Sequence, residues 1–391
     1  MSQQFSKTIR DAPFELNYMR YDEDLYECML TEKVCKIRET FKFEQIDVFR
    51  SPRKFFRNRC RFEVTGGGLS RGIRMPIEYG LWEGGSCSVC VEAFPIACDV
   101  INKAMLELRS FLVTNGHVIH DIRAAHFVST TTKQGLVITL IYERPIDQTC
   151  WLQEAQSLSE YLRLTLNIPE ISIVAKAKKQ KLMLGPGFVI EEFVLSDSRR
   201  LTYKQVEDGF SNPNGVVNRL SLEWLCDVVK KNISSQGDLL ELYCGNANHT
   251  CALSPFVRRI VAIELNKSLC EAAVENLRLN SIVNVKIVHL DSQTFSDRIL
   301  RTKKYTDENE DFTFSIVLVD PPRAGLDAKT LQMISGYDDI IYISCNPEAL
   351  ARDLKPLLLD HQISRFAVFD HFPYTPHLEC GVHLIRKNKN V

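Results

Sequence analysis

The sequence predicts an α/β protein: a smaller N-terminal α+β domain over residues 1–200, then a C-terminal doubly wound, Rossmann-like domain over residues 201–391. Three observations support this prediction. The chain has 391 residues, more than one small domain needs. Up to about residue 200, strand-like and helix-like segments follow one another without regular alternation. Beyond it, apolar strand-like runs alternate with amphipathic helical segments, which is typical of a parallel sheet covered on both faces.

The composition is that of a globular protein, with 45% hydrophobic and 25% charged residues. The 48 basic and 49 acidic residues leave a net charge of −1, so a nucleic-acid surface would have to be a local patch. The sequence has no apolar run long enough to span a bilayer, and its start lacks the apolar core of a secretory signal. We therefore expect a cytoplasmic protein whose 13 cysteines are reduced thiols.

In the first half, apolar residues at helical spacing predict a helix within residues 21–40 and a second over Trp151–Leu166. Short runs bounded by turn residues predict strands at RFEV, HFVSTTT, GLVITLIY and ISIVAKAKKQKL. These segments together indicate an antiparallel sheet with helices.

In the second half, a predicted helix over Asn214–Asn232 is followed by alternating strands and helices. The predicted strands are DLLELY, RIVAIE, NVKIVHL, FSIVLV, DIIYIS, RFAVFD and GVHLIR, and helices are predicted at Lys267–Asn280, after Asp327 and at Glu348–Leu359. The charged run Thr302–Asp311 is predicted to be a solvated loop.

Candidate cofactor ligands follow the first, second and fourth of these strands. Gly245 makes a turn after the first, and Glu264 ends the second about twenty positions later, where a carboxylate can accept both hydroxyls of a ribose. Two prolines hold Asp320 at the end of the fourth strand. The absence of a G-x-G-x-x-G motif favours S-adenosylmethionine over a dinucleotide. Taken alone, Gly245 fits an ordinary tight turn equally well.

Two further residues at this edge of the sheet are candidates for chemistry. The fifth strand runs directly into Cys345, followed by Asn346, Pro347 and a helix, so the thiol is expected at the edge of the cofactor cleft. Glu379 lies just before the last strand. A buried cysteine is usually inert and a loop carboxylate is usually solvated. Together, however, Cys345 and Glu379 form a candidate pair of nucleophile and base.

The chain resembles the tRNA (uracil-5-)-methyltransferases. The resemblance rests on LLELYCGN, VDPPRAGLD, YISCNPEAL and FPYTPHLECGV, and on FSNPNGVVN, WLQEAQSL, FRSPRKFFRNRCRF and VEAFP earlier in the chain. It implies methyl transfer from S-adenosylmethionine to C5 of a T-loop uridine in tRNA, which gives 5-methyluridine. It also implies that Cys345 adds to C6 as a thiolate, so that C5 becomes nucleophilic, and that Glu379 then removes the C5 proton and releases the thiol.

The same resemblance implies which residues bind the methyl donor: Asn212, Tyr243, Asn248, Glu264 and Asp320. Asn212 stands where the family usually has glutamine, and its shorter side chain can miss the contact. Ala247 stands where the family usually has the second glycine of the loop, and its methyl group can crowd the cofactor.

The densest basic segment of the chain is Arg50–Arg61. If Phe56–Phe62 is a strand, Arg57, Arg59 and Arg61 project from one face while the residues between them point to the other. Such an arginine strip suits phosphate groups, so we expect tRNA to bind there. The alternative is that the strip is an ordinary solvated face. The target uracil must then be swung out of its loop to reach the thiol.

Other basic residues and cysteines carry weaker expectations. A second basic patch is predicted at Lys176, Lys178, Lys179 and Lys181. Cys87, Cys90 and Cys98 lack a convincing fourth ligand, so we expect no metal and no iron–sulfur cluster. We expect neither a membrane nor an obligate protein partner. Two alternative functions stay open, namely the same chemistry on ribosomal RNA and a non-catalytic tRNA-folding chaperone.

Overall fold

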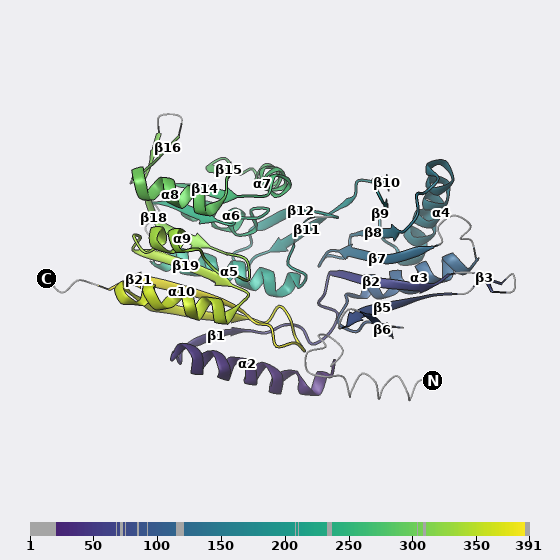
Figure 1. The fold of residues 1–391 in the computed structure, drawn as a ribbon, viewed down its shortest axis with the longest axis horizontal. Helices are drawn as coiled ribbons and strands as arrows, with labels where there is room; N and C mark the ends of the chain where they lie inside the picture. Colours follow the sequence, from purple (N-terminus) through teal and green to yellow (C-terminus); the bar gives the residue numbers. More distant parts are fainter. Residues whose placement is uncertain are drawn as a thin grey trace. The chain divides into compact units, whose positions relative to one another are not determined.

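A computed structural model describes residues 21–67, 69–70, 73–74, 76–83, 86–91, 93–114, 121–207, 209, 211–232, 237–302, 304–307 and 310–387 (Figure 1). Its contacts divide the chain into two compact units. The first is built mainly from Pro52–Glu192 and Lys204–Gly215, and the second from Asp24–Ser51, Phe193–Tyr203 and Val216–Val391. The division therefore differs from the predicted single boundary at residue 200.

The second unit is organised by an eight-stranded sheet in the order β1-β20-β21-β19-β18-β13-β14-β15. Its strands are β1 (Ile46–Phe49), β13 (Asp238–Leu242), β14 (Arg259–Glu264), β15 (Val285–His289), β18 (Phe314–Val319), β19 (Asp339–Ser344), β20 (His361–Phe369) and β21 (Glu379–Arg386). Neighbouring strands are parallel except at β21, which is antiparallel to both β19 and β20. The predicted doubly wound fold is confirmed, with an antiparallel strand that the sequence pattern did not reveal.

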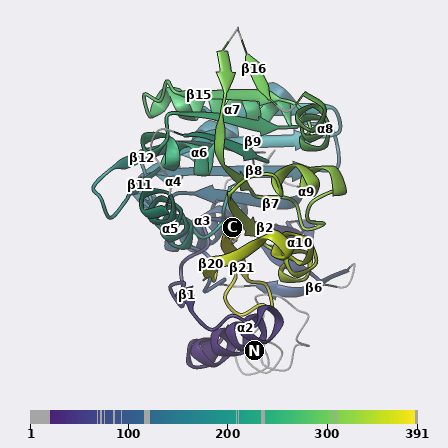
Figure 2. The ribbon, with the colours of Figure 1, turned by 90° about the vertical axis from the view of Figure 1, so that its left-hand side faces the viewer.

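Helices cover both faces of this sheet: α5 (Gly215–Asn232), α6 (Asn248–Leu253), α7 (Lys267–Leu279), α8 (Ser292–Thr302), α9 (Ala328–Ile334) and α10 (Pro347–Asp360). Figure 2 shows α5 and α6 on one side of the strands and α8, α9 and α10 on the other. The side chains of Asn266, Asp327 and Asn346 accept hydrogen bonds from the first free N–H groups of α7, α9 and α10. These caps fix where three helices begin at the carboxyl edge of the sheet.

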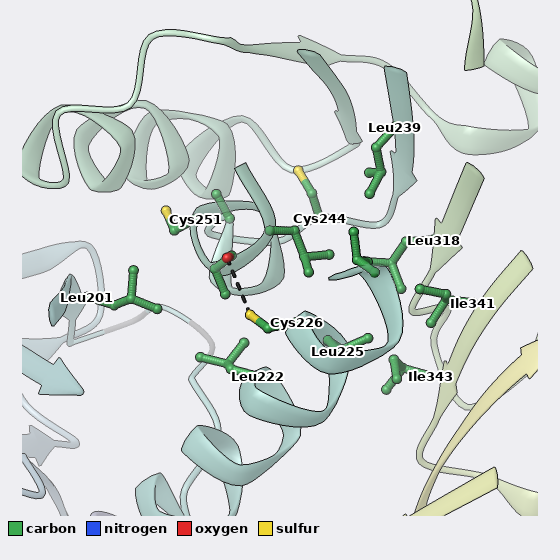
Figure 3. Close-up of a cluster of buried hydrophobic side chains, with 14 of the residues drawn as sticks. Leu201, Leu222, Leu225, Cys226, Leu239, Cys244, Cys251, Leu318, Ile341 and Ile343 are labelled. Carbon is green, nitrogen blue, oxygen red and sulfur yellow. Dashed lines mark hydrogen bonds between the residues drawn. The ribbon is translucent and has the colours of Figure 1, made fainter. Parts of the chain in front are cut away.

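The core between α5 and the sheet is apolar and holds several cysteines (Figure 3). Leu222 and Leu225 of α5 belong to one buried cluster with Leu239, Leu318, Ile341 and Ile343 from the strands. Cys226, Cys244 and Cys251 lie in the same cluster, and burial raises the pKa of each thiol. These three cysteines are therefore packing residues, as expected for most of the thirteen.

The segment before residue 52 joins the second unit through α2 (Tyr26–Phe41) and β1. Strand β1 pairs in parallel with β20, so that Ile46 lies opposite Phe366. The ring of Phe41 packs on the ring of Phe366, with 5.0 Å between their centroids. A segment before residue 52 thus forms an edge of the sheet in the second unit. For this reason the two units are not separated by a single boundary at residue 200.

The first unit contains a seven-stranded sheet in the order β10-β9-β8-β7-β2-β5-β6. Its strands are β2 (Arg59–Gly66), β5 (Ile77–Glu83), β6 (Ser86–Val91), β7 (Ile122–Ser129), β8 (Gly135–Tyr142), β9 (Glu170–Ala177) and β10 (Gln180–Leu184). The predicted antiparallel pairing holds except between β8 and β9, which are parallel and joined through α4 (Gln148–Leu166). Helix α3 (Asp99–Thr114) contacts α4 and the strands, so the two helices cover one face.

Short strand pairs complete the described structure. They are β3 (Leu69–Ser70) with β4 (Ile73–Arg74), β11 (Phe188–Val194) with β12 (Arg200–Val206), and β16 (Tyr305–Asp307) with β17 (Glu310–Phe312). The last pair corrects the prediction of a solvated loop over Thr302–Asp311. Tyr305 is buried, and its ring packs against Phe295 and Phe312 with centroids 5.5 Å away in each case. Aromatic packing therefore folds this charged run into a hairpin.

Candidate active site

The loop after β13 has the backbone geometry of a ligand cradle. Tyr243, Gly245 and Ala247 all have positive φ, at 63°, 58° and 66°. A Cβ added to Gly245 would meet no atom within 4 Å, so the space above this turn is open. Ala247 is fully buried, and this left-handed conformation costs a residue with a Cβ about 1–2 kcal/mol. The alanine that replaces the family's usual glycine at position 247 therefore fits, but with a strained backbone.

The Glu264 carboxylate holds the turn at Gly245 by accepting hydrogen bonds from two backbone N–H groups. One oxygen accepts from the backbone N–H of Gly245 at 3.0 Å, and the other accepts from that of Asn266 at 2.7 Å. The side chain is half-buried at the end of β14, directly beside β13. The structure therefore brings Gly245 and Glu264 together, as the sequence pattern predicts.

Asn248 and Tyr243 are held by residues on neighbouring helices. The amide of Asn248 forms a reciprocal pair with Asn218 of α5, at 2.9 and 3.1 Å. Burial and the nearby Asp327 carboxylate raise the pKa of Tyr243, whose hydroxyl also lies beside Ser292 and Thr330. Sequence reasoning missed Asn218, although a polar residue among the apolar positions of a predicted helix was a usable signal.

Asp320 ends β18 in a loop that is tied to the next strand. The carboxylate of Asp353 in α10 accepts from the Leu326 N–H at 2.8 Å and from the Tyr342 hydroxyl at 2.7 Å. A Cβ on Gly325 (φ 79°) would come within 2.5 Å of this same Asp353 carboxylate, so glycine is required there. Burial raises the pKa of Asp320 to about 7.

The register of β21 against β19 explains how Glu379 reaches Cys345. Ser344 lies opposite Cys380 in the antiparallel pair, so the next residues outward are Cys345, directly after β19, and Glu379, the first residue of β21. A parallel last strand would have carried Glu379 to the opposite edge of the sheet.

The thiol and the carboxyl of this pair influence each other. Burial raises the pKa of Cys345, and the charges of Glu379 and Asp320 raise it further, while the Arg323 guanidinium lowers it. Burial raises the pKa of Glu379 to about 8, with the Asp320 charge as a second cause. Three groups thus titrate near neutral pH or above within one edge of the sheet, which suits acid–base and nucleophilic chemistry.

A buried lysine from α2 fixes the loop that precedes Glu379. The Nζ atom of Lys33 lies 2.8 Å from an Asp370 carboxylate oxygen and donates to the backbone oxygens of Phe372, at 3.0 Å, and His377, at 3.1 Å. Sequence reasoning missed this clamp because Lys33 belongs to a helix more than 300 residues away along the chain. The adjacent His371 is fully buried and was missed as well.

Asn212 belongs to the first unit and is half-buried there. The other predicted donor-binding residues, Tyr243, Asn248, Glu264 and Asp320, belong to the second unit.

The predicted arginine strip is present in the first unit, but one of its three arginines, Arg59, is bound to other parts of the chain. The alternate residues Phe56, Cys60 and Phe62 are buried, and Arg61 is exposed. Strand β2 begins only at Arg59. The guanidinium of Arg59 donates to the backbone oxygens of Val206 and Glu207 and to the Ser211 hydroxyl, at 3.0–3.2 Å. Arg59 therefore ties down the chain after β12 and has less to offer a phosphate than predicted.

The predicted lysine patch lies at the turn between β9 and β10. Lys176 and Lys181 pair with the buried Glu207 at 2.7 and 3.3 Å. Lys178 and Lys179 are exposed in the turn.

A sequence model of the family described as tRNA (Uracil-5-)-methyltransferase matches residues 23–387. The chain belongs to the tRNA (uracil-5-)-methyltransferase family. Its relatives include the tRNA/tmRNA (uracil-C(5))-methyltransferase of Shewanella sediminis, 36% identical over 379 residues that cover 95% of this chain and 100% of the relative. The protein of the same name from Aromatoleum aromaticum is 38% identical over 371 residues, covering 93% and 96% of the two chains.

A solved structure supports the same fold for this member of the tRNA (uracil-5-)-methyltransferase family. The crystal structure of Pyrococcus abyssi tRNA (uracil-54, C5)-methyltransferase in complex with S-adenosyl-L-homocysteine superposes with a TM-score of 0.67. The match covers 92% of this chain and 83% of that one, at 20% identity.

The described residues of this family member contain no group of three or more histidine, cysteine or acidic side chains placed to hold a metal ion. The side chains of Cys87 and Cys90 lie outside the described residues, and Cys98 is buried. Among the helices that the structure describes, none is both long enough and apolar enough to cross a membrane.

Replacing Glu264 by alanine in this methyltransferase family member is expected to raise the KM for S-adenosylmethionine about 10- to 100-fold. The reason is the loss of a charged acceptor, a change of about 1.5–3 kcal/mol. The KM for tRNA should change far less, as measured by steady-state methyl incorporation. Glu271→Ala removes an exposed carboxylate from the neighbouring helix α7 and serves as control. Equal changes in both KM values would mean that Glu264 acts only through its hydrogen bonds to the turn.

Proposed function

We propose that this protein transfers a methyl group from S-adenosylmethionine to C5 of a tRNA uridine and forms 5-methyluridine. The observation that carries the proposal is the meeting of Cys345 and Glu379 at facing ends of antiparallel strands, beside Asp320. A thiol next to a buried carboxyl of raised pKa suits a reaction that needs a nucleophile first and a base last. Membership in the tRNA (uracil-5-)-methyltransferase family supports the same chemistry.

The chemistry of uracil requires both residues. C5 of uracil is a weak nucleophile, and addition of the Cys345 thiolate to C6 makes the ring enolate-like. C5 can then take the methyl group. The Glu379 carboxylate removes the C5 proton, after which the C6–S bond breaks and the thiolate leaves. Arg323 favours the thiolate, because its charge lowers the pKa of Cys345.

The carboxyl edge of the sheet suits the methyl donor. S-adenosylmethionine supplies an electrophilic methyl group when bound. The open space at Gly245 and the Glu264 carboxylate fit a ribose, and we assign Tyr243, Asn248 and Asp320 to the same pocket. Asn212 remains an assignment by family resemblance.

We propose that the RNA is a tRNA and the target its T-loop uridine, with the reaction taking place in the cytoplasm. Two relatives are named for tRNA and tmRNA, and the Pyrococcus abyssi protein for uracil-54 of tRNA. We assign the exposed Arg61, with Arg57 and Arg59 beside it, to the phosphate backbone.

The direct test is methyl incorporation from labelled S-adenosylmethionine into an unmodified tRNA transcript, followed by nucleoside analysis. Label in 5-methyluridine at one T-loop position is expected. Label only in ribosomal RNA offered in parallel would favour the alternative substrate. Binding of tRNA without any incorporation would favour the non-catalytic chaperone.

Replacing Arg61 by alanine is expected to weaken tRNA binding and to reduce the slope of log K against log salt by about one, which is the loss of one phosphate contact. Arg163→Ala is the matched control, because Arg163 is exposed on α4, which covers the other face of the same sheet. The measurement is a filter-binding titration at several salt concentrations. An unchanged slope in the Arg61 variant would place the phosphates elsewhere.

A further inference from the structure

His371 is a fully buried imidazole next to the proposed base. It follows β20, and its Nε2 lies 3.5 Å from Oε1 of Glu379. Neither ring nitrogen has a hydrogen-bond partner among the residues that the structure describes. Buried polar atoms are normally paired, so an imidazole with two unpaired nitrogens in this place indicates a functional role.

Titratable groups face this pair from several elements. Asp320 follows β18, Cys345 follows β19, and His249 lies in α6. Farther inside, Glu241 of β13 lies 4.0 Å from His249 and accepts from the Thr250 hydroxyl at 2.6 Å. The neighbouring Asp370 is bound by Lys33, so its charge is already compensated.

Burial decides the protonation of the imidazole. It lowers the pKa of His371 to about 3, and the charge of His249 would lower it further. Burial raises the pKa of Glu379 to about 8. His371 is therefore neutral at pH 7, and a proton that enters this pair resides on the carboxyl. A neutral imidazole still offers one N–H donor.

Only one tautomer suits the pair while the carboxyl is charged, as it must be to take the C5 proton. With the hydrogen on Nε2, the ring can donate to Oε1 of Glu379 whether the carboxyl is charged or neutral. With the hydrogen on Nδ1, the Nε2 lone pair would face a carboxylate oxygen and repel it. Hydrogen bonds of catalytic groups are often long before substrate binds and shorten in the complex, which accounts for the 3.5 Å separation.

We propose that His371 is a positioning residue for Glu379, donating through Nε2–H to Oε1 so that Oε2 takes the C5 proton. The inference rests on the proposed function. In that step the C5–H bond breaks and its electron pair forms the C5–C6 double bond. The C6–S bond breaks, Cys345 leaves as thiolate, and the proton goes to Oε2. The imidazole stays neutral throughout.

The first test compares kcat from pH 6 to 9 for the wild type, His371→Phe and His371→Gln. The phenylalanine has no donor, so its kcat at pH 7 is expected to fall about 10- to 100-fold with both KM values unchanged. The acid limb of its profile should move up by about one to two pH units, because a lost donor makes the carboxylate harder to form. The glutamine N–H should restore most of both. A profile for His371→Phe equal to that of the wild type would overturn the proposal.

His383→Phe is the matched control. His383 is also fully buried and pairs with a carboxylate, Asp339 at 2.9 Å, but it lies toward the far end of β21. Its loss should lower stability and leave the pH profile unchanged. A shifted profile here as well would show that any buried histidine has this effect, which also overturns the proposal.

A second measurement does not depend on methylation. Nitrogen NMR of the histidine-labelled protein should show His371 as a neutral imidazole from pH 5 to 9, with hydrogen on Nε2 at pH 9, where the Glu379 carboxyl is charged. An imidazolium, or hydrogen on Nδ1 at pH 9, would overturn the proposal even if the phenylalanine variant failed to fold. Failure of the wild type to methylate any RNA would instead contradict the proposed function, and the NMR result would still decide the role of His371.

Discussion

Glu379→Gln is expected to stop the reaction after methyl transfer and to leave protein and RNA joined through the sulfur of Cys345. The glutamine amide fills the same space but cannot accept the C5 proton, so elimination cannot follow addition. We expect turnover to fall about 100- to 10,000-fold, the usual contribution of a general base. A protein–RNA band that survives a denaturing gel, carries the label and yields a Cys345 peptide would confirm the order of steps.

Cys345→Ala is the complement of that variant. It should give neither methylated RNA nor a covalent band, because the ring is never activated. Two other thiols lie close by in the fold, but Cys380 and Cys244 are buried and their pKa values are raised by burial. Activity in Cys345→Ala, or an adduct that maps to Cys244 or Cys380, would refute the assignment of the nucleophile.

Lys33→Met is expected to lower the free energy of unfolding by about 3–5 kcal/mol, because it leaves the buried Asp370 carboxylate without its counter-ion. Two backbone oxygens of the loop before Glu379 lose their donor as well. Urea unfolding followed by circular dichroism measures the change. In the variant that remains folded, kcat should also fall, since the loop is no longer fixed.

Lys36→Met provides the comparison on the same helix. Lys36 is exposed, and its pair with Glu32 four residues away is a surface contact at 3.2 Å. Its loss should change the free energy of unfolding by less than about 1 kcal/mol. A similar loss in both variants would show that α2 is stabilised by its helical propensity rather than by the buried pair.

Local patterns in the sequence were sufficient to predict the strands around the candidate site and most of the helices, but not the short helix α6 or helix α8. The apolar runs of β13, β14, β18 and β19 are buried on both faces, and such runs can be recognised without knowing their neighbours. Asp327 is the cap of α9, where a helix start was predicted. The positions of Gly245 and Glu264 at the carboxyl ends of neighbouring strands could be predicted from the same order of strands and helices.

Features that depend on distant partners could not be predicted in this way. An apolar strand looks the same whether it is parallel or antiparallel, so GVHLIR did not reveal that β21 runs against its neighbours. Arg59 was predicted to bind phosphate from its local sequence alone. The backbone oxygens that it binds instead lie about 150 residues later in the chain, where no local pattern connects them to Arg59. No sequence pattern identified His371, because its proposed role depends on its burial and on one neighbouring carboxyl.

The pairing of β1 with β20, and of Lys33 with Asp370, has a consequence for synthesis on the ribosome. These partners are separated by more than 300 residues, so the sheet of the second unit can close its edge only after the segment with β20 and Asp370 has been synthesised. The bulk of the first unit, Pro52–Glu192, is available for folding long before that. Until β20 has been made, the buried side chains of α2, such as Leu30, Val34 and Ile37, lack the sheet that covers them in the folded protein.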